Sequence, residues 1–284
     1  MKIILAGYEG SKKILSTTSF LYKKYIPSDF DIFYLNYGKF SGELETGTYI
    51  SLDDQQKGGS SSWSRYLVNY LKSLDDEFVI FSLDDYLQSN YMNWQAYENA
   101  YNYMKSDSYI VSCKMSIGPT YRLNDFDKID DQIYLLRKTA GYSATTQMNL
   151  WRRNFLIDIL SRISTPWEFE LNASPYLSSS SFKVIGSFDV IFNYPEPSSI
   201  SSRHPNKISV LGNKISDIDK CIDNGYLIEN DLIMGQWIGS VKNYSECKND
   251  PYIALEKCPA GELEYYKLML DTCYTRNQLP FYND

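Results

Sequence analysis

The sequence predicts an α/β fold, with a mostly parallel sheet flanked by helices and an irregular C-terminal part. Apolar runs of strand length alternate with amphipathic helical patterns through the first third of the chain, which is typical of a parallel sheet covered by helices. The run FVIFSL at 78–83 carries one polar side chain, as expected of a strand buried on both faces. With 284 residues, 43% of them hydrophobic, the chain has ample material for a core.

The elements of the first 115 residues follow from hydrophobic periodicity. Strands are expected where apolar residues run together between turn residues, and helices where they recur every three or four positions. In chain order we expect a strand at 2–8, a helix from about 11 to 25, strands at 31–37 and 48–52, a helix at 63–74, a strand at 78–83, a helix at 91–105 and a strand at 109–114.

The rest of the chain is less regular. Met148, Trp151, Phe155 and Ile159 stand at helical spacing and predict a helix over 146–161. The other expected elements are a strand at 132–137, a short helix from Pro166, two short strands within 183–193 broken at Gly186, a proline-punctuated loop at 194–207 and a helix at 261–273. No internal repeat or linker is visible, so residues 1–284 are interpreted as one domain.

Composition excludes several classes of function. The net charge is −7 and the lysines and arginines are scattered, so the basic footprint of a nucleic-acid-binding protein is missing. The longest apolar runs are about six residues, whereas a transmembrane helix needs roughly 20. Five cysteines without a CxxC pair disfavour a zinc site and suggest a reducing, cytoplasmic location. His204 is the single histidine, which excludes a multi-histidine metal site.

Two adjacent carboxylates, Asp84 and Asp85, follow the buried strand at 78–83. The carboxyl edge of an open α/β sheet is where ligands bind. Two neighbouring acids repel each other unless a cation or a set of donors neutralises them, and a divalent metal that carries a phosphorylated ligand does so. Leu-Asp-Asp occurs three times in the chain, but only this copy follows a buried strand and precedes a helix-like segment. A capping role is the alternative.

Three segments, taken in order, resemble glycosyltransferases of the GT-A type, in particular small bacterial and viral enzymes that build surface polysaccharides. They are SSWSRYLVNYLKSLDDEFVIFSLDDYL, YSATTQMNLWRRNFLIDIL and TPWEFELNAS. The resemblance covers about residues 2–193. It implies a Rossmann-like GT-A sheet, a nucleotide-binding half at 1–115 and an acceptor half at 116–284. It also implies a UDP- or GDP-linked sugar donor, a glycan or lipid-linked acceptor, and possible peripheral contact with a membrane.

The resemblance assigns roles to four acids. Asp84 and Asp85 match the Asp-rich motif that holds Mn²⁺ or Mg²⁺ on the donor diphosphate, although the spacing here is DD and not DxD. Glu170 is the first choice and Glu168 the second for the base that deprotonates the acceptor hydroxyl, which implies inversion. In a helix that begins at Pro166 these two acids lie about 200° apart, so only one faces the site. The alternative is that both favour the first helical turn through the macrodipole.

The same resemblance places the nucleotide at the end of the first strand. Gly7, Tyr8 and Ser11 match the position that cradles base and ribose, with Tyr8 stacking on the base. The segment is not a G-x-G-x-x-G fingerprint, which disfavours a dinucleotide-dependent dehydrogenase. An ordinary strand-to-helix turn is the alternative. His204, beside Arg203 in the loop at 194–207, is expected to complete the metal shell or contact phosphate. The alternative is a surface loop whose histidine faces solvent.

Two functions from different classes remain open at this point. The first is a glycosyltransferase, and the second is a non-catalytic nucleotide- or sugar-binding module on the same fold. Turnover of donor and acceptor together distinguishes them, because a binding module releases no nucleoside diphosphate.

Overall fold

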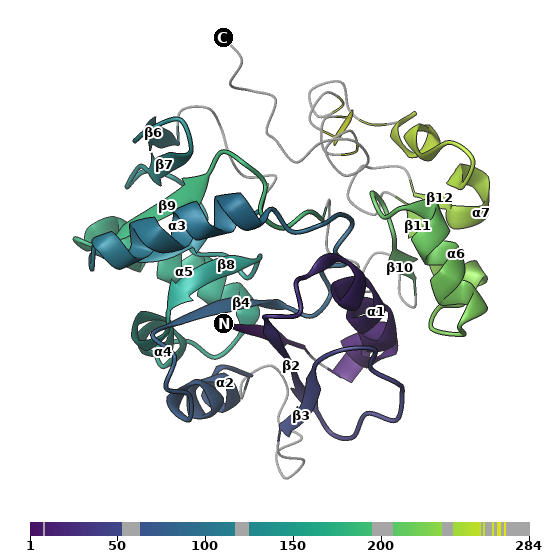
Figure 1. Cartoon of the computed structure of the whole chain (residues 1–284), viewed down its shortest axis with the longest axis horizontal. Helices are drawn as coiled ribbons and strands as arrows, with labels where there is room; N and C mark the ends of the chain where they lie inside the picture. Colours follow the sequence, from purple (N-terminus) through teal and green to yellow (C-terminus); the bar gives the residue numbers. More distant parts are fainter. Residues whose placement is uncertain are drawn as a thin grey trace.

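The computed structural model describes residues 1–7, 9–52, 63–116, 125–194, 207–234 and 241–256, and the single positions 258, 263, 266, 267 and 270. Within these residues the central feature is a nine-stranded sheet with the order β3-β2-β1-β4-β8-β5-β9-β7-β6 (Figure 1). Its strands are β1 (Lys2–Ala6), β2 (Asp31–Tyr37), β3 (Thr48–Leu52), β4 (Phe78–Leu83), β5 (Ile110–Lys114), β6 (Phe126–Lys128), β7 (Ile133–Leu136), β8 (Asn149–Arg152) and β9 (Lys183–Ser187).

Most strands of this sheet run in one direction. β3, β2, β1 and β4 pair in parallel. β8 lies antiparallel to both β4 and β5, which makes those two strands parallel to each other, and β9 pairs in parallel with β5. β7 is the second reversed strand, antiparallel to β9 and to β6. The expectation of a mostly parallel α/β sheet flanked by helices is confirmed.

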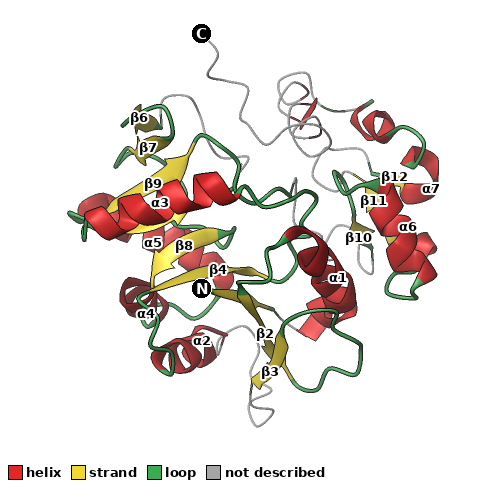
Figure 2. Ribbon diagram, viewed as in Figure 1, coloured by secondary structure: helices red, strands yellow, loops and turns green. Residues whose placement is uncertain are grey.

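Helices cover both faces of the sheet (Figure 2). A 3₁₀ helix η1 (Glu9–Ile14), α1 (Leu15–Tyr25) and α3 (Trp94–Ser106) lie on one face, while α2 (Trp63–Lys72), α4 (Arg153–Leu160) and α5 (Pro166–Ser179) lie on the other. Side chains alternate along a strand, so Ile3 and Leu5 of β1 join the core under α1 and α3. Ile4 and Ala6 join the opposite core.

The helix expected over 146–161 is wrong in its first half. Residues 149–152 form β8, and α4 begins only at Arg153. Pairing with β4 and β5 on both sides overrides the helical spacing. Leu150 faces the core under α1 and α3, whereas Trp151 faces the other core, so the buried residues follow the two-residue period of a strand.

A second correction concerns 183–193. One strand, β9, ends at Ser187, and residues 188–194 contain no second strand of the kind we expected. The helix from Pro166 is longer than expected, because α5 continues to Ser179. Of the helix expected at 261–273, only residues 263, 266, 267 and 270 are described, and each is helical. No helix in the described part of the chain combines the length and apolarity needed to cross a bilayer.

The C-terminal part contains a small three-stranded sheet that packs beside α1 (Figure 1). Leu21 and Tyr25 of α1 share an apolar core with its residues, and Lys24 and Tyr25 both donate to the buried Asp217 carboxylate. The elements here are β10 (Ile208–Ser209), α6 (Ile215–Asp223), η3 (Glu229–Asp231), β11 (Leu232–Met234), β12 (Lys242–Asn243), α7 (Tyr244–Cys247) and η4 (Pro251–Leu255).

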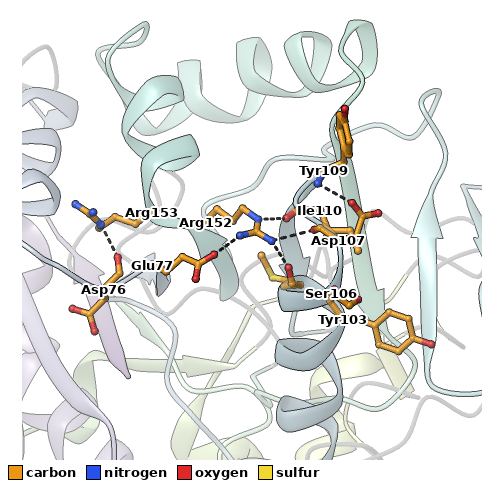
Figure 3. Close-up of polar contacts among 10 residues, drawn as sticks. Asp76, Glu77, Tyr103, Ser106, Asp107, Tyr109, Ile110, Arg152 and Arg153 are labelled. Atoms are coloured by element: carbon orange, nitrogen blue, oxygen red, sulfur yellow. Dashed lines mark hydrogen bonds and ion pairs between the residues drawn. The ribbon is translucent and has the colours of Figure 1, made fainter.

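Arg152, the last residue of β8, joins the amino ends of β4 and β5 (Figure 3). Its guanidinium donates to the carbonyl of Ile110 at 2.9 Å, to the carbonyls of Met104 and Asp107 at the end of α3, and to Glu77 Oε1 at 2.5 Å. This contact lies at the edge of the sheet opposite to the carboxyl ends of β4 and β5. Arg152 therefore stabilises the packing of β4, β5 and β8 and lies away from the carboxyl ends of β4 and β5.

Candidate functional site at the carboxyl edge of the sheet

The chain reverses its order of strand addition between β1 and β4. β2 follows β1 directly and pairs on one side of it, whereas β4 comes later and pairs on the other side. Ligands of open α/β sheets bind at such a switch point, outside the carboxyl ends of the strands. Gly7 and Asp84 directly follow the two strands, and Asp84 N–H donates to the Ala6 carbonyl at 3.2 Å. The acidic pair therefore lies at the switch point.

Asp84 is held by side chains from two neighbouring segments. Its Oδ2 accepts hydrogen bonds from Ser11 Oγ at 2.8 Å and from Asn36 Nδ2 at 3.1 Å. The residue is 1% exposed. Burial raises the pKa of Asp84 to about 8, the Asp85 charge adds to this, and the bonds from Ser11 and Asn36 act in the opposite direction. Asp84 is thus a buried acid whose charge the protein alone only partly compensates.

Gly7 lies directly against this carboxylate. The backbone N–H of Gly7 donates to the Leu35 carbonyl at 2.8 Å, which fixes the chain at the end of β1. The sequence suggested that Gly7 and Ser11 approach a nucleotide. The structure brings both of them to Asp84, and their contact with a nucleotide stays a prediction.

Three buried tyrosines interact with the charge of Asp85. Burial first and the Asp85 charge in addition raise the pKa of Tyr22, Tyr86 and Tyr194, so these hydroxyls keep their protons. The Tyr86 and Tyr194 rings lie 4.4 Å apart, and Tyr194 Oη accepts from the Met148 N–H at 3.0 Å. Tyr194, which we expected to begin an exposed loop, is instead 4% exposed.

Glu170 reaches the same edge from α5. Its Oε1 accepts hydrogen bonds from both the N–H and the hydroxyl of Thr146, at 2.9 and 2.8 Å. The Thr146 carbonyl in turn accepts from Leu83 N–H at 3.1 Å, next to Asp84. Among the described residues no group donates to Oε2 of Glu170. The carboxylate is therefore fixed through one oxygen and half-buried, with the other oxygen available to a ligand.

Glu168 has a different role. Its Oε2 accepts from Ser164 N–H at 2.6 Å, and its own N–H donates to the Thr165 hydroxyl at 3.1 Å. These two bonds close the first turn of α5 in a variant of the capping box, in which the N–H of Ser164, one residue before the N-cap Thr165, donates to the glutamate. Of the two glutamates that the sequence offered as a base, only Glu170 is joined to the end of β4. Glu168 stabilises the helix that carries it.

Lys114 is a residue of this edge that the sequence analysis missed. It ends β5, is 2% exposed, and donates from Nζ to the Tyr142 carbonyl at 2.7 Å. Burial lowers the pKa of Lys114 to about 7, and the nearby Glu170 charge acts to raise it. A lysine that closes the apolar run YIVSCK was the available signal. Asn36, Thr146 and the tyrosines gave no comparable local signal.

The carboxylate oxygens of Asp84 and Asp85 fit a Mg²⁺ or Mn²⁺ ion that also binds a phosphorylated ligand. Asp84 and Asp85 are adjacent carboxylates, and Oδ1 of Asp84 is buried without a hydrogen-bond partner among the described residues. The described residues contain no group of three or more histidine, cysteine or acidic side chains placed to hold a metal. Mg²⁺ takes one or two carboxylates and completes its shell with phosphate and water. The pair therefore fits a cation shared with a phosphorylated ligand.

Two residues that the sequence analysis selected lie outside the described residues. They are Tyr8, expected to stack on the base, and His204, expected at the metal. Both assignments stay predictions.

The comparisons with known proteins gave matches to solved structures. No protein-family model and no curated protein sequence matches the chain. Among solved structures, S. aureus TarS in complex with UDP has a TM-score of 0.43 and 13% identity, covering 68% of this chain and 59% of TarS. The mannosyltransferase PcManGT from Pyrobaculum calidifontis, in complex with GDP-Man and Mn²⁺, has a TM-score of 0.45 and 11% identity over 96% of this chain and 73% of PcManGT.

A cytidylyltransferase from Leptospira borgpetersenii is also similar, with a TM-score of 0.41 and 11% identity over 91% of this chain and 98% of that one. A glycosyltransferase thus stands among the similar structures beside a nucleotidyltransferase. The chain spans about three fifths of TarS. At these identities the substrates of the similar proteins do not carry over to this chain.

Proposed function

We propose that this protein is a glycosyltransferase that moves a sugar from a UDP- or GDP-linked donor to a hydroxyl of a glycan or lipid-linked acceptor. One observation carries the proposal. A buried acidic pair at the switch point and a separately anchored glutamate lie along one edge of the sheet, joined through Thr146. Transfer from a nucleotide sugar needs these two functions, one at the leaving diphosphate and one at the attacking hydroxyl.

The donor end of the site is formed by Asp84, Asp85, Ser11 and Gly7. A diphosphate adds negative charge next to two carboxylates, so a divalent cation is required between them. Asp85, with Asp84 as its neighbour, would hold Mn²⁺ or Mg²⁺. When bound, the cation would offset the charge that grows on the leaving diphosphate.

The acceptor end is formed by Glu170. Its Oε2 takes the proton of the acceptor hydroxyl, and the hydroxyl oxygen forms a bond to the anomeric carbon. The bond between that carbon and the diphosphate oxygen breaks, and the diphosphate leaves with the electron pair. Because a single base assists one direct displacement, the anomeric configuration inverts.

The exposed surface of α5 beside Glu170 supports a carbohydrate acceptor. Trp167 is 69% exposed and Leu171 is 62% exposed. They stand four residues apart, so they share one face of the helix next to Glu170. A tryptophan offers a flat apolar ring with an N–H at its rim, which suits the apolar face of a sugar.

The test is turnover of UDP- and GDP-sugars with Mn²⁺ or Mg²⁺ and a panel of glycan and lipid-linked acceptors. Release of nucleoside diphosphate that depends on the acceptor and is lost in Glu170→Gln is the expected result. Release of pyrophosphate from a nucleoside triphosphate and a sugar would instead identify a nucleotidyltransferase. Donor binding by calorimetry without any turnover across the panel would identify the non-catalytic binding module.

A further inference from the structure

Lys114 occupies a position where a charge is costly. It lies at the carboxyl end of β5 with 2% of its surface exposed. Taking an ammonium out of water is unfavourable unless partners replace the water. An apolar side chain of similar length would fill the same space without that cost. The contacts that Lys114 makes therefore indicate what its charge does.

The first contact is with a backbone carbonyl in an uncommon conformation. Tyr142 has φ 53°, and among the described residues it is the only non-glycine with positive φ. Bulky residues rarely adopt this left-handed conformation, and it persists where the surroundings hold it in place. Lys114 Nζ donates to the Tyr142 carbonyl at 2.7 Å and so holds this turn from inside the molecule.

The turn that Lys114 holds leads directly to Glu170. Ala144 N–H donates to Ser174 Oγ on α5 at 3.1 Å. Two residues later, Thr146 gives its N–H and hydroxyl to Glu170 Oε1. Residues 142–146 are thus attached to β5 at one end and to α5 at the other. Displacement of Tyr142 would displace the two donors that orient Glu170.

We propose that Lys114 is a positioning residue, whose ammonium holds the Tyr142 carbonyl and thereby the turn that presents Thr146 to Glu170. This inference rests on the proposed function, in which Glu170 accepts the proton of the acceptor hydroxyl. The Lys114 charge also interacts with Glu170 itself. Among the described residues, Tyr86 and Tyr194 also interact with Glu170, and both interact with Asp85 as well.

The kinetic test compares Lys114→Met with Lys114→Arg. Lys114→Met should lower kcat about 10- to 100-fold, as a misplaced catalytic group does, with the donor KM within about twofold. Lys114→Arg, which keeps the charge and the hydrogen-bond donors, should restore kcat. A fall in kcat accompanied by an equal rise in the donor KM would assign Lys114 a merely structural role.

Lys138 offers a matched control in the same region. Its Nζ also donates to backbone carbonyls, of Leu177 at 3.0 Å and of Phe182, but it has no contact with Tyr142 or Thr146. Lys138→Met should lower stability and leave kcat within about twofold of the wild type. A loss of kcat of the same size in Lys138→Met and Lys114→Met would overturn the proposal.

A second measurement needs neither turnover nor an apolar substitution at Lys114. In ¹⁵N-lysine NMR, the Lys114 ammonium should titrate at a lower pH in Glu170→Gln than in the wild type, because the carboxylate that favours its charged form is removed. An unchanged titration midpoint of Lys114 would show that the two residues are not coupled. If the midpoint moves and no sugar is transferred, the proposed reaction fails while the pairing of Lys114 with Glu170 stands.

Discussion

A β-carbon on Gly7 would lie 1.9 Å from Oδ2 of Asp84 and 2.4 Å from Nδ2 of Asn36. Both distances are far below van der Waals contact, and both atoms belong to buried side chains. Position 7 is therefore a glycine because the Asp84 carboxylate occupies the space of its side chain. The turn after β1 and the side chain of Asp84 after β4 therefore restrict each other's position.

Gly7→Ala should displace Asp84 and lower the free energy of unfolding by about 1–3 kcal/mol, as overpacking of a buried site does. Donor binding should weaken as well. Urea unfolding and calorimetry measure the two effects. Gly141→Ala is the control, because a β-carbon at position 141 meets nothing within 4 Å. Equal stability of the two variants would contradict the packing of Asp84 against Gly7.

Asp85→Asn should abolish the metal-dependent part of nucleotide binding. UDP or GDP with Mn²⁺ at about 100 times its dissociation constant adds roughly 2.7 kcal/mol to the stability of the wild type. For a domain of this size that raises the melting temperature by roughly 2–4 °C per kcal/mol. Asp131→Asn, in an exposed acidic pair elsewhere, should keep the shift. A wild-type metal response in Asp85→Asn would remove this residue from the metal site.

The stability of the wild type should contain a pH-dependent contribution from Lys114. Its pKa is about 7 in the folded protein and about 10.4 in an unfolded chain. Between these values the unfolded chain binds more protons, so this contribution rises with pH, by at most about 1.4 kcal/mol per unit. Below pH 7 the burial of the charged Lys114 lowers the free energy of unfolding most. The substitution Lys114→Met should therefore raise the free energy of unfolding most in that range.

The measurement is urea unfolding of the wild type and Lys114→Met at several pH values from 6 to 9. The stability difference between the two proteins should shrink as the pH rises above 7. Asp84 titrates in both proteins and cancels in the difference. Two parallel curves would show that Lys114 keeps its ordinary proton affinity in the folded state.

Trp167→Ala should raise the acceptor KM about 3- to 10-fold, which corresponds to the 0.5–1.5 kcal/mol typical of an aromatic contact. The donor KM should not change, because the donor end lies at Asp84 and Asp85. Trp94→Ala is the control, since Trp94 is 41% exposed and begins α3 on the opposite face of the sheet. An acceptor KM that responds equally to both variants would exclude Trp167 as a specific acceptor contact.

Arg152→Met should destabilise the protein without weakening the site. It leaves the carbonyls of Met104, Asp107 and Ile110 without their donor, which costs about 2–4 kcal/mol. Arg162→Met, which removes an exposed pair with Asp158, should have no measurable effect. Since Arg152 lies at the opposite edge, the folded variant should bind the donor as the wild type does. Weaker donor binding would show that the two edges are coupled.

The first half of the fold was predictable because its signals are local. The apolar run at 78–83 identified β4, and the acids after it identified the edge of the sheet. β8 was misread because its spacing fits a helix as well as a strand. What makes it a strand is pairing with Ile80 and Cys113, which lie 70 and 37 residues before Leu150. A short window of sequence around Leu150 does not contain these pairing partners, so its periodicity cannot reveal the strand.

The acids of the candidate site could be predicted from the sequence, whereas the groups that hydrogen-bond to them could not. Asp84, Asp85 and Glu170 are recognisable from the segments that carry them. Asn36 and Lys114 become part of the site only through the strand order, which brings the ends of β2 and β5 to the edge where β4 ends. The sequence left Glu168 and Glu170 as alternatives, and the hydrogen bond from Ser164 N–H to Glu168 separates them by showing which one caps the helix.

The position of β8 determines when β4 and β5 can join one sheet as the chain leaves the ribosome. β5 pairs with β8 and β9 and not with β4, so a nascent chain that ends near residue 115 has no partner for β5. At that stage one side of β4 is an open apolar edge, the kind of surface that associates with other chains. Closure of this edge requires residues 149–152 to pair with β4 on one side and with β5 on the other. Assembly of the site thus waits until more than half of the chain has been synthesised.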